Sequence, residues 1–215
     1  MQSVHFLHIG KTGGNALKAA IRPVSGEFGL VLHNHKTRLH DVPEGARAVF
    51  FVRDPAARFV SAFNSRLRMG RPLKNAPWNE AEKRAFDIFR TPTELAEAIS
   101  SPDGVLASKA ADAMHGIRHV NAPLGRWLDS VAYLAQRRNS ILHVGHQETL
   151  SGDFEAIKVK LGLPGALILS DDPLVAHHTP DSFVTHLSPL ARRNLACWYR
   201  ADYEIMRYLD ALRAA

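Results

Sequence analysis

The chain has 215 residues, of which 46% are hydrophobic and 22% are charged, a composition typical of a globular protein. Its formal net charge of +6 favours anionic partners such as a nucleotide, a nucleic acid, a membrane surface or a sulfated or phosphorylated substrate. No run approaches the roughly 20 apolar residues that span a bilayer, so no membrane span is expected.

The length predicts a single domain over residues 1–215. The only cysteine, Cys197, excludes an internal disulfide and fits a reducing compartment. The N-terminus reaches a polar glycine loop before the apolar core of a signal peptide could form. We therefore expect a complete, cytoplasmic protein.

The first predicted element is a buried strand over residues 3–9, followed by the loop "IGKTGGN" and a short helix over 15–22. A Gly-Lys-Thr between a strand and a helix suggests a phosphate-binding loop. A Walker A loop would need its first glycine at position 5, which is His5, and here the spare glycines follow the lysine. The loop amides would point from the helix N-terminus toward an anion, with Lys11 adding a positive charge.

A second strand is predicted over residues 28–34, with two histidines at its carboxyl end. His33 and His35 are two positions apart, so on an extended segment both side chains face the same way. Metal binding by these histidines with His40, or by the pair His177 and His178, is a weaker alternative because no nearby cysteine or carboxylate completes a ligand set. The letters "HNH" lack the context of the nuclease motif of that name.

The third predicted strand, 47–52, is continuously apolar, as expected of a parallel strand covered on both faces. Asp54 is a good helix N-cap, so a helix should begin directly after the strand and end at Gly70. Arg53 at the strand end could make a bidentate contact with a phosphate, and the Ser61 hydroxyl could donate to the same group.

The rest of the chain is predicted to be mostly helical. The expected elements are an irregular helical region over 71–135 with a capping box at Thr91, a fourth strand at about 140–145, a helix at about 149–161, a loop-rich stretch over 164–187 and one long C-terminal helix capped by Ser188. Strands that alternate with helices predict an α/β fold of three layers, P-loop-like, with a mainly parallel central sheet flanked by helices.

The segments "FLHIGKTGGNAL" (6–17) and "FFVRDPAARFVSAF" (50–63) together resemble the sulfotransferases that use 3′-phosphoadenosine 5′-phosphosulfate (PAPS). The first is similar to the 5′-phosphosulfate loop of that family, and the second to its 3′-phosphate motif. The segments 141–164 and 190–209 resemble the carbohydrate-type branch of the same family. The loop has Asn15 where the commoner pattern has Thr or Ser.

The resemblance implies that PAPS donates a sulfuryl group to a hydroxyl acceptor, with a carbohydrate as the implied acceptor and no metal. His35, or else His33, would be the catalytic base, and Lys11 would stabilise charge on the leaving group. Arg53 and Ser61 would bind the 3′-phosphate. The loop residues implied in binding the 5′-phosphosulfate are Lys11, Thr12, Gly13, Gly14, Asn15 and Ala16.

Two other functions are weighed against this one. A P-loop kinase that uses ATP and magnesium would need the missing leading glycine and a clear magnesium-binding aspartate at a strand end. A basic nucleic-acid-binding protein is suggested by the pI alone, and the aromatic residues are not interleaved with Lys and Arg as a stacking surface would require. No nucleic-acid partner is therefore expected.

Overall fold

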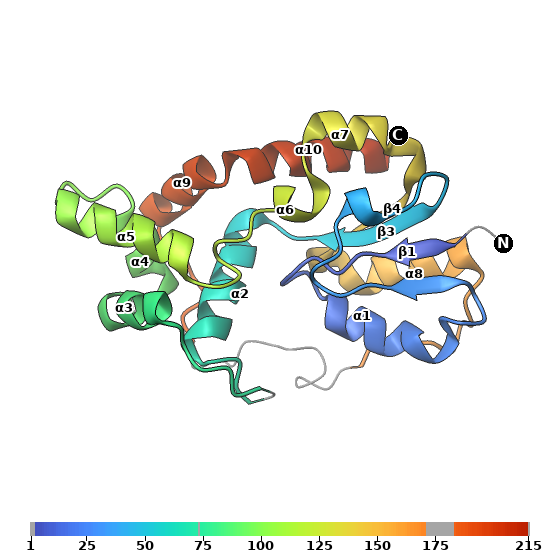
Figure 1. Cartoon of the computed structure of the whole chain (residues 1–215), viewed down its shortest axis with the longest axis horizontal. Coiled ribbons are helices and arrows are strands. Elements are labelled where there is room, and N and C mark those ends of the chain that lie inside the picture. Colours follow the sequence, from blue (N-terminus) through green and yellow to red (C-terminus); the bar gives the residue numbers. More distant parts are fainter. Residues whose placement is uncertain (1–2, 73, 171–182, 215) are drawn as a thin grey trace. The chain divides into compact units, whose positions relative to one another are not determined.

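The computed structural model describes residues 3–72, 74–170 and 183–214. These residues form two compact units. Figure 1 colours the chain from the N-terminus (blue) to the C-terminus (red). The sheet unit comprises 3–53, 124–170 and 204–214, and the helical unit comprises 54–72, 74–123 and 183–203. The single domain over 1–215 stays a prediction.

The sheet unit is built on four parallel strands in the order β2-β1-β3-β4. Their bounds are β1 Val4–Phe6, β2 Leu30–Leu32, β3 Arg47–Val52 and β4 Ile141–His146. The predicted α/β class with a parallel sheet flanked by helices is therefore confirmed, although β1 and β2 are shorter than the predicted 3–9 and 28–34. The P-loop-like detail of the fold stays a prediction.

The strand order reverses direction at the centre of the sheet. From β1 the chain passes to β2 on one side, whereas from β3 it passes to β4 on the other side. In open α/β sheets, ligands bind outside the carboxyl ends of the strands at such a reversal. The reversal lies between β1 and β3, whose carboxyl ends precede the glycine loop and Arg53.

Helices α1 (Gly14–Ile21) and α8 (Leu150–Leu161) lie on the same side of the sheet in Figure 1. Leu17 of α1 and Phe154 of α8 share one buried apolar cluster with Phe6 and Phe51 of the strands. Burying such side chains contributes about 1.5–3 kcal/mol each, which fixes α1 against β1. Helix α8 matches the predicted helix at about 149–161, and its C-cap is Gly162, which adopts a left-handed φ of 63°.

The remaining elements of the sheet unit are short helices and 3-10 turns, together with the later part of the long helix α10. They are η1 Arg22–Val24, η2 Leu39–Asp41, α6 Gly125–Leu128, α7 Val131–Gln136, η3 Arg138–Ser140, η4 Gln147–Thr149 and the later part of α10 Arg200–Ala214. Among the described residues, no helix has both the length and the apolar character that crossing a membrane requires.

The helical unit contains α2 Pro55–Leu67, α3 Glu80–Ile88, α4 Pro92–Ala98, α5 Gly104–Gly116, α9 Pro189–Trp198 and the start of α10. Its core is aromatic and aliphatic, with Phe63, Phe86 and Leu195 fully buried. The capping predictions are confirmed, because the side chains of Asp54 and Ser188 accept hydrogen bonds from backbone N–H groups in the first turns of α2 and α9.

The prediction of one long C-terminal helix is wrong, because the helix is interrupted at Tyr199. This residue leaves helical geometry with φ −98° and ψ 27°, and α10 begins at Arg200. The Tyr199 side chain is buried, and its hydroxyl donates a hydrogen bond of 2.9 Å to the Val120 carbonyl. This contact is remote in sequence, so helix periodicity alone could not have predicted it.

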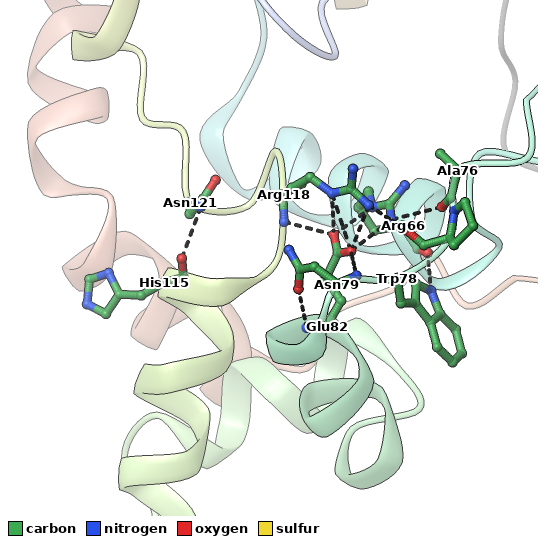
Figure 2. A network of polar contacts seen from close by, with 9 residues as sticks. Arg66, Ala76, Trp78, Asn79, Glu82, His115, Arg118 and Asn121 are labelled. Carbon is green, nitrogen blue, oxygen red and sulfur yellow. Dashed lines mark hydrogen bonds and ion pairs between the residues drawn. The ribbon is translucent and has the colours of Figure 1, made fainter.

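A network of charged groups in the helical unit surrounds the buried Glu82 carboxylate (Figure 2). The Arg66 guanidinium donates to both carboxylate oxygens of Glu82, at 2.6 and 2.8 Å. Arg118 donates to the same carboxylate from its guanidinium at 3.0 Å and from its backbone N–H at 3.1 Å. The Asn79 N–H donates at 3.0 Å, and Trp78 Nε1 donates to the Arg66 carbonyl at 2.7 Å. The network ties the segment before α3 to the end of α2.

Candidate functional site

The predicted site residues of the sheet unit follow the carboxyl ends of three adjacent strands. The backbone pairing continues past the strand ends, because His33 N donates to the Phe6 carbonyl at 3.0 Å and Leu7 N to the Val49 carbonyl at 2.9 Å. Neighbouring strands lie about 4.8 Å apart, so residues that follow them meet at one edge of the sheet. The glycine loop after β1 is therefore flanked by His33 after β2 and by half-buried Arg53 after β3.

The glycine loop has two residues in the left-handed region, Lys11 with φ 71° and Gly13 with φ 82°. For a residue with a side chain this conformation costs about 1–2 kcal/mol, so Lys11 is held in place by its surroundings. A Cβ on Gly13 would lie 3.1 Å from Leu150 Cδ1. Thr12 is buried, and its hydroxyl donates to the Ile9 carbonyl at 3.0 Å. The Thr12 side chain thus braces the loop, which leaves its backbone amide as the group for the predicted anion contact.

The loop leads into the N-terminus of α1, whose first turn contains Gly14, Asn15 and Ala16. The N–H groups of a first helical turn have no partner within the helix, and the helix dipole adds partial positive charge there. No acidic side chain lies in this turn to offset that charge. The backbone around α1 therefore suits an anion, as the sequence predicted.

His33 is held by a second histidine, His5 of β1. His33 Nε2 and His5 Nδ1 are 2.9 Å apart, so one of the two rings donates a hydrogen bond to the other. Burial lowers the pKa of His33, and the neighbouring His5 and Lys18 lower it further, whereas Asp41 opposes the shift. These effects favour the neutral form of His33.

His35 lies in a different environment from His33. The strand ends at Leu32, and the next residues form a turn in which Lys36 N donates to Asn34 Oδ1 at 2.8 Å. The alternation of an extended strand therefore does not reach His35, and the two histidines contact different partners. The exposed ring of His35 lies 3.8 Å, centroid to centroid, from the ring of His8. His8 was missed by sequence reasoning, although a histidine directly before the glycine loop was a visible signal.

Arg53 and Ser61 belong to different units. Arg53 ends the first segment of the sheet unit, whereas half-buried Ser61 lies on α2 of the helical unit. Asp54 caps α2 by accepting from Ala57 N at 2.8 Å, and it also accepts from the Tyr203 hydroxyl at 3.2 Å. Burial and Asp54 raise the pKa of Tyr203 to about 12, so Tyr203 stays a hydrogen-bond donor. A joint phosphate contact by Arg53 and Ser61 stays a prediction.

The other histidine that the sequence considered is engaged elsewhere in the sheet unit. His40 Nε2 lies 3.1 Å from Asp129 Oδ2, and its ring stacks on Tyr133 at 3.8 Å between centroids. His177 and His178 lie outside the described residues. Across the ranges that the structure describes, no group of three or more His, Cys, Asp or Glu side chains is arranged to hold a metal ion.

The chain was also compared with known proteins. No protein-family model, no curated protein and no solved structure matches it.

Proposed function

We propose that this protein is a sulfotransferase that uses PAPS as its sulfuryl donor. One observation supports the proposal most strongly: the glycine loop, the two histidines and Arg53 follow the carboxyl ends of three adjacent parallel strands. An anion-binding loop, a neutral base and a guanidinium are the groups that sulfuryl transfer from a nucleotide requires. The glycines that follow Lys11 suit a short phosphosulfate without a bound magnesium ion.

In this proposal the donor is bound by charge and by backbone amides. The N-terminus of α1 and Lys11 would hold the 5′-phosphosulfate, because both present positive charge at the end of β1. Arg53 would make a bidentate contact with the 3′-phosphate, and Ser61 is the further residue that the sequence predicts there. The reversal of strand order between β1 and β3 is where a nucleotide binds in open α/β sheets.

The reaction is an in-line displacement at sulfur. A histidine after β2 accepts the proton of the acceptor hydroxyl, and the acceptor oxygen forms a bond to sulfur. The bond between sulfur and the bridging oxygen breaks, so 3′,5′-adenosine diphosphate leaves with the negative charge that Lys11 stabilises. Positioning and electrostatic stabilisation supply most of the catalysis, as they do in phosphoryl transfer. The resemblance points to a carbohydrate acceptor.

Nucleotide binding tests the proposal against its alternatives. We expect 3′,5′-adenosine diphosphate to bind roughly 10- to 100-fold more tightly than 5′-AMP, because a charge-assisted contact contributes about 1.5–3 kcal/mol. Arg53→Ala should remove this preference. Arg193→Ala should preserve it, because Arg193 is exposed on α9.

Isothermal titration of wild-type protein and both variants with each nucleotide gives the affinities. Equal affinity for the two adenine nucleotides would overturn the sulfotransferase proposal. Preferential binding of ATP with magnesium would favour the kinase. Binding of a DNA oligomer alone would favour the nucleic-acid-binding protein.

A further inference from the structure

His8 lies directly against the first residue of α1. Its side chain follows β1 and is only 3% exposed. A Cβ built on Gly14 would lie 2.4 Å from His8 Cδ2 and 2.7 Å from His8 Nε2, closer than real Cβ atoms approach other heavy atoms. The His8 ring therefore occupies the space that any side chain at position 14 would need.

The backbone does not explain why position 14 is a glycine. Gly13 has a positive φ, whereas Gly14 has none and begins a regular helix. Glycine in a helix is about 1 kcal/mol less favourable than alanine, so a glycine here needs another reason. The close approach of the His8 ring supplies it.

The His8 ring also contacts His35. The two ring centroids are 3.8 Å apart, and the ring planes are inclined by 40°. The His35 side chain is exposed, and the buried His8 ring gives it a surface to pack against. The backbone at His35 is held separately, because Trp127 Nε1 donates to the His35 carbonyl at 2.9 Å.

We propose that His8 is a positioning residue that holds the His35 ring beside the N-terminus of α1, and that Gly14 is required because a side chain there would displace His8. The inference rests on the proposed function in taking His35 as the base and α1 as the binding site for the donor anion. Through His8, the base and the anion-binding helix keep one fixed spacing. Proton transfer depends on such positioning, and misplacement by about 1 Å can cost about 100-fold in rate.

A double-mutant cycle tests this arrangement. We expect His8→Ala to lower kcat of sulfuryl transfer about 10- to 100-fold and to change the affinity for 3′,5′-adenosine diphosphate by less than about twofold. Gly14→Ala should also lower kcat, because the new methyl group pushes the His8 ring away. In the His8→Ala background the same substitution should have no further effect, since the space is then empty. Equal losses from Gly14→Ala in both backgrounds would overturn the coupling.

A second measurement needs neither donor nor acceptor. The ring signals of His35 in the NMR spectrum should move in His8→Ala, because a neighbouring aromatic ring is lost. They should move much less in His8→Phe, which keeps a flat ring and should recover part of kcat. His143→Phe is the matched control, since His143 is a buried histidine on β4, and it should leave His35 unchanged.

The two measurements separate the two proposals. Unchanged His35 signals in His8→Ala would overturn the positioning role, whatever the activity. If the signals move but wild-type protein transfers no sulfuryl group and does not prefer 3′,5′-adenosine diphosphate, the contact is confirmed and the sulfotransferase proposal fails.

Discussion

Charged and polar groups are arranged differently in the two units. In the helical unit the Glu82 carboxylate is fully buried and accepts hydrogen bonds from Arg66, Arg118 and Asn79. In the sheet unit the proposed base His35 is exposed at a strand end, and Lys11 and Arg53 are half-buried. Lys11 also has a left-handed backbone. A buried carboxylate whose oxygens are all engaged has no capacity left for a ligand, so its role is to hold the fold. Strand-end groups that remain reachable are the ones that can bind and react.

The largest expected effect comes from replacing the proposed base, His35. His35→Ala should lower the rate of sulfuryl transfer by about 10²–10⁴-fold, because no other group would accept the acceptor proton as well. Nucleotide affinity should stay nearly intact, since the base contacts the acceptor. Single-turnover kinetics with PAPS measure the rate, and titration with 3′,5′-adenosine diphosphate measures binding. A near-normal rate in His35→Ala and a large loss in His33→Ala would transfer the role to His33.

In the helical unit, removing the Glu82 charge should lower the stability of the fold. Glu82→Gln should lower the free energy of unfolding by about 3–5 kcal/mol, because two guanidinium groups would lose their buried counter-charge. Urea unfolding at pH 7 measures the loss. Glu80→Gln is the matched control, since Glu80 pairs with Lys83 on the exposed face of α3, and its loss should be undetectable. A loss as small as that of the control would mean that the network contributes nothing to folding.

Local signals in the sequence were sufficient for much of the fold. The apolar run at 47–52 and the alternation of strands with helices predicted the parallel sheet, and Asp54, Thr91 and Ser188 were identified as caps. These signals depend only on neighbouring residues, so they do not require knowledge of how distant parts of the chain pack. Of the site, the sequence placed the glycine loop, Arg53 and the two histidines at strand ends.

The sequence could not show which residues meet across the fold. His8 contacts His35 from 27 positions away, and Arg118 reaches Glu82 from 36 positions away. The Tyr199 contact that accompanies the helix break is more remote still, because Val120 lies 79 positions away. These contacts depend on how elements pack, which periodicity and capping signals do not encode. The different partners of His33 and His35 could not be predicted for the same reason.

Acid should destabilise the two units in different pH ranges. Burial lowers the pKa of His143 to about 4, helped by Lys160 and Arg213 and opposed by Asp153. The unfolded chain takes up this proton first, so stability should fall by about 3 kcal/mol as the pH drops from about 6.5 to 4.

Burial alone would raise the pKa of Glu82, but hydrogen bonds from the two arginines lower it to about 2. Its contribution, again about 3 kcal/mol, should be lost between about pH 4.5 and 2.

Variants assign each range to its residue. Urea unfolding of wild-type protein at pH 7, 5 and 3 should show a loss over both steps. His143→Phe should reduce the loss of stability between about pH 6.5 and 4 (the upper step). Glu82→Gln should reduce the loss between about pH 4.5 and 2 (the lower step). An upper step that persists in His143→Phe would mean that other histidines of the sheet unit cause it.

The smallest expected effect concerns the strained lysine of the glycine loop. Lys11→Gly should unfold with a free energy about 0.5–1 kcal/mol larger than Lys11→Ala, because glycine adopts φ 71° without steric cost and this outweighs its greater freedom in the unfolded chain. Both variants should lose sulfuryl transfer, and turnover should fall more than the affinity for 3′,5′-adenosine diphosphate, because the lysine charge acts mainly on the leaving group in the transition state. The same pair of substitutions at Lys83, inside α3, should give the opposite order of stability, since glycine is unfavourable within a helix. If alanine were also the more stable replacement at position 11, the left-handed conformation would not be present in solution, and the strain at the loop could not be attributed to its function.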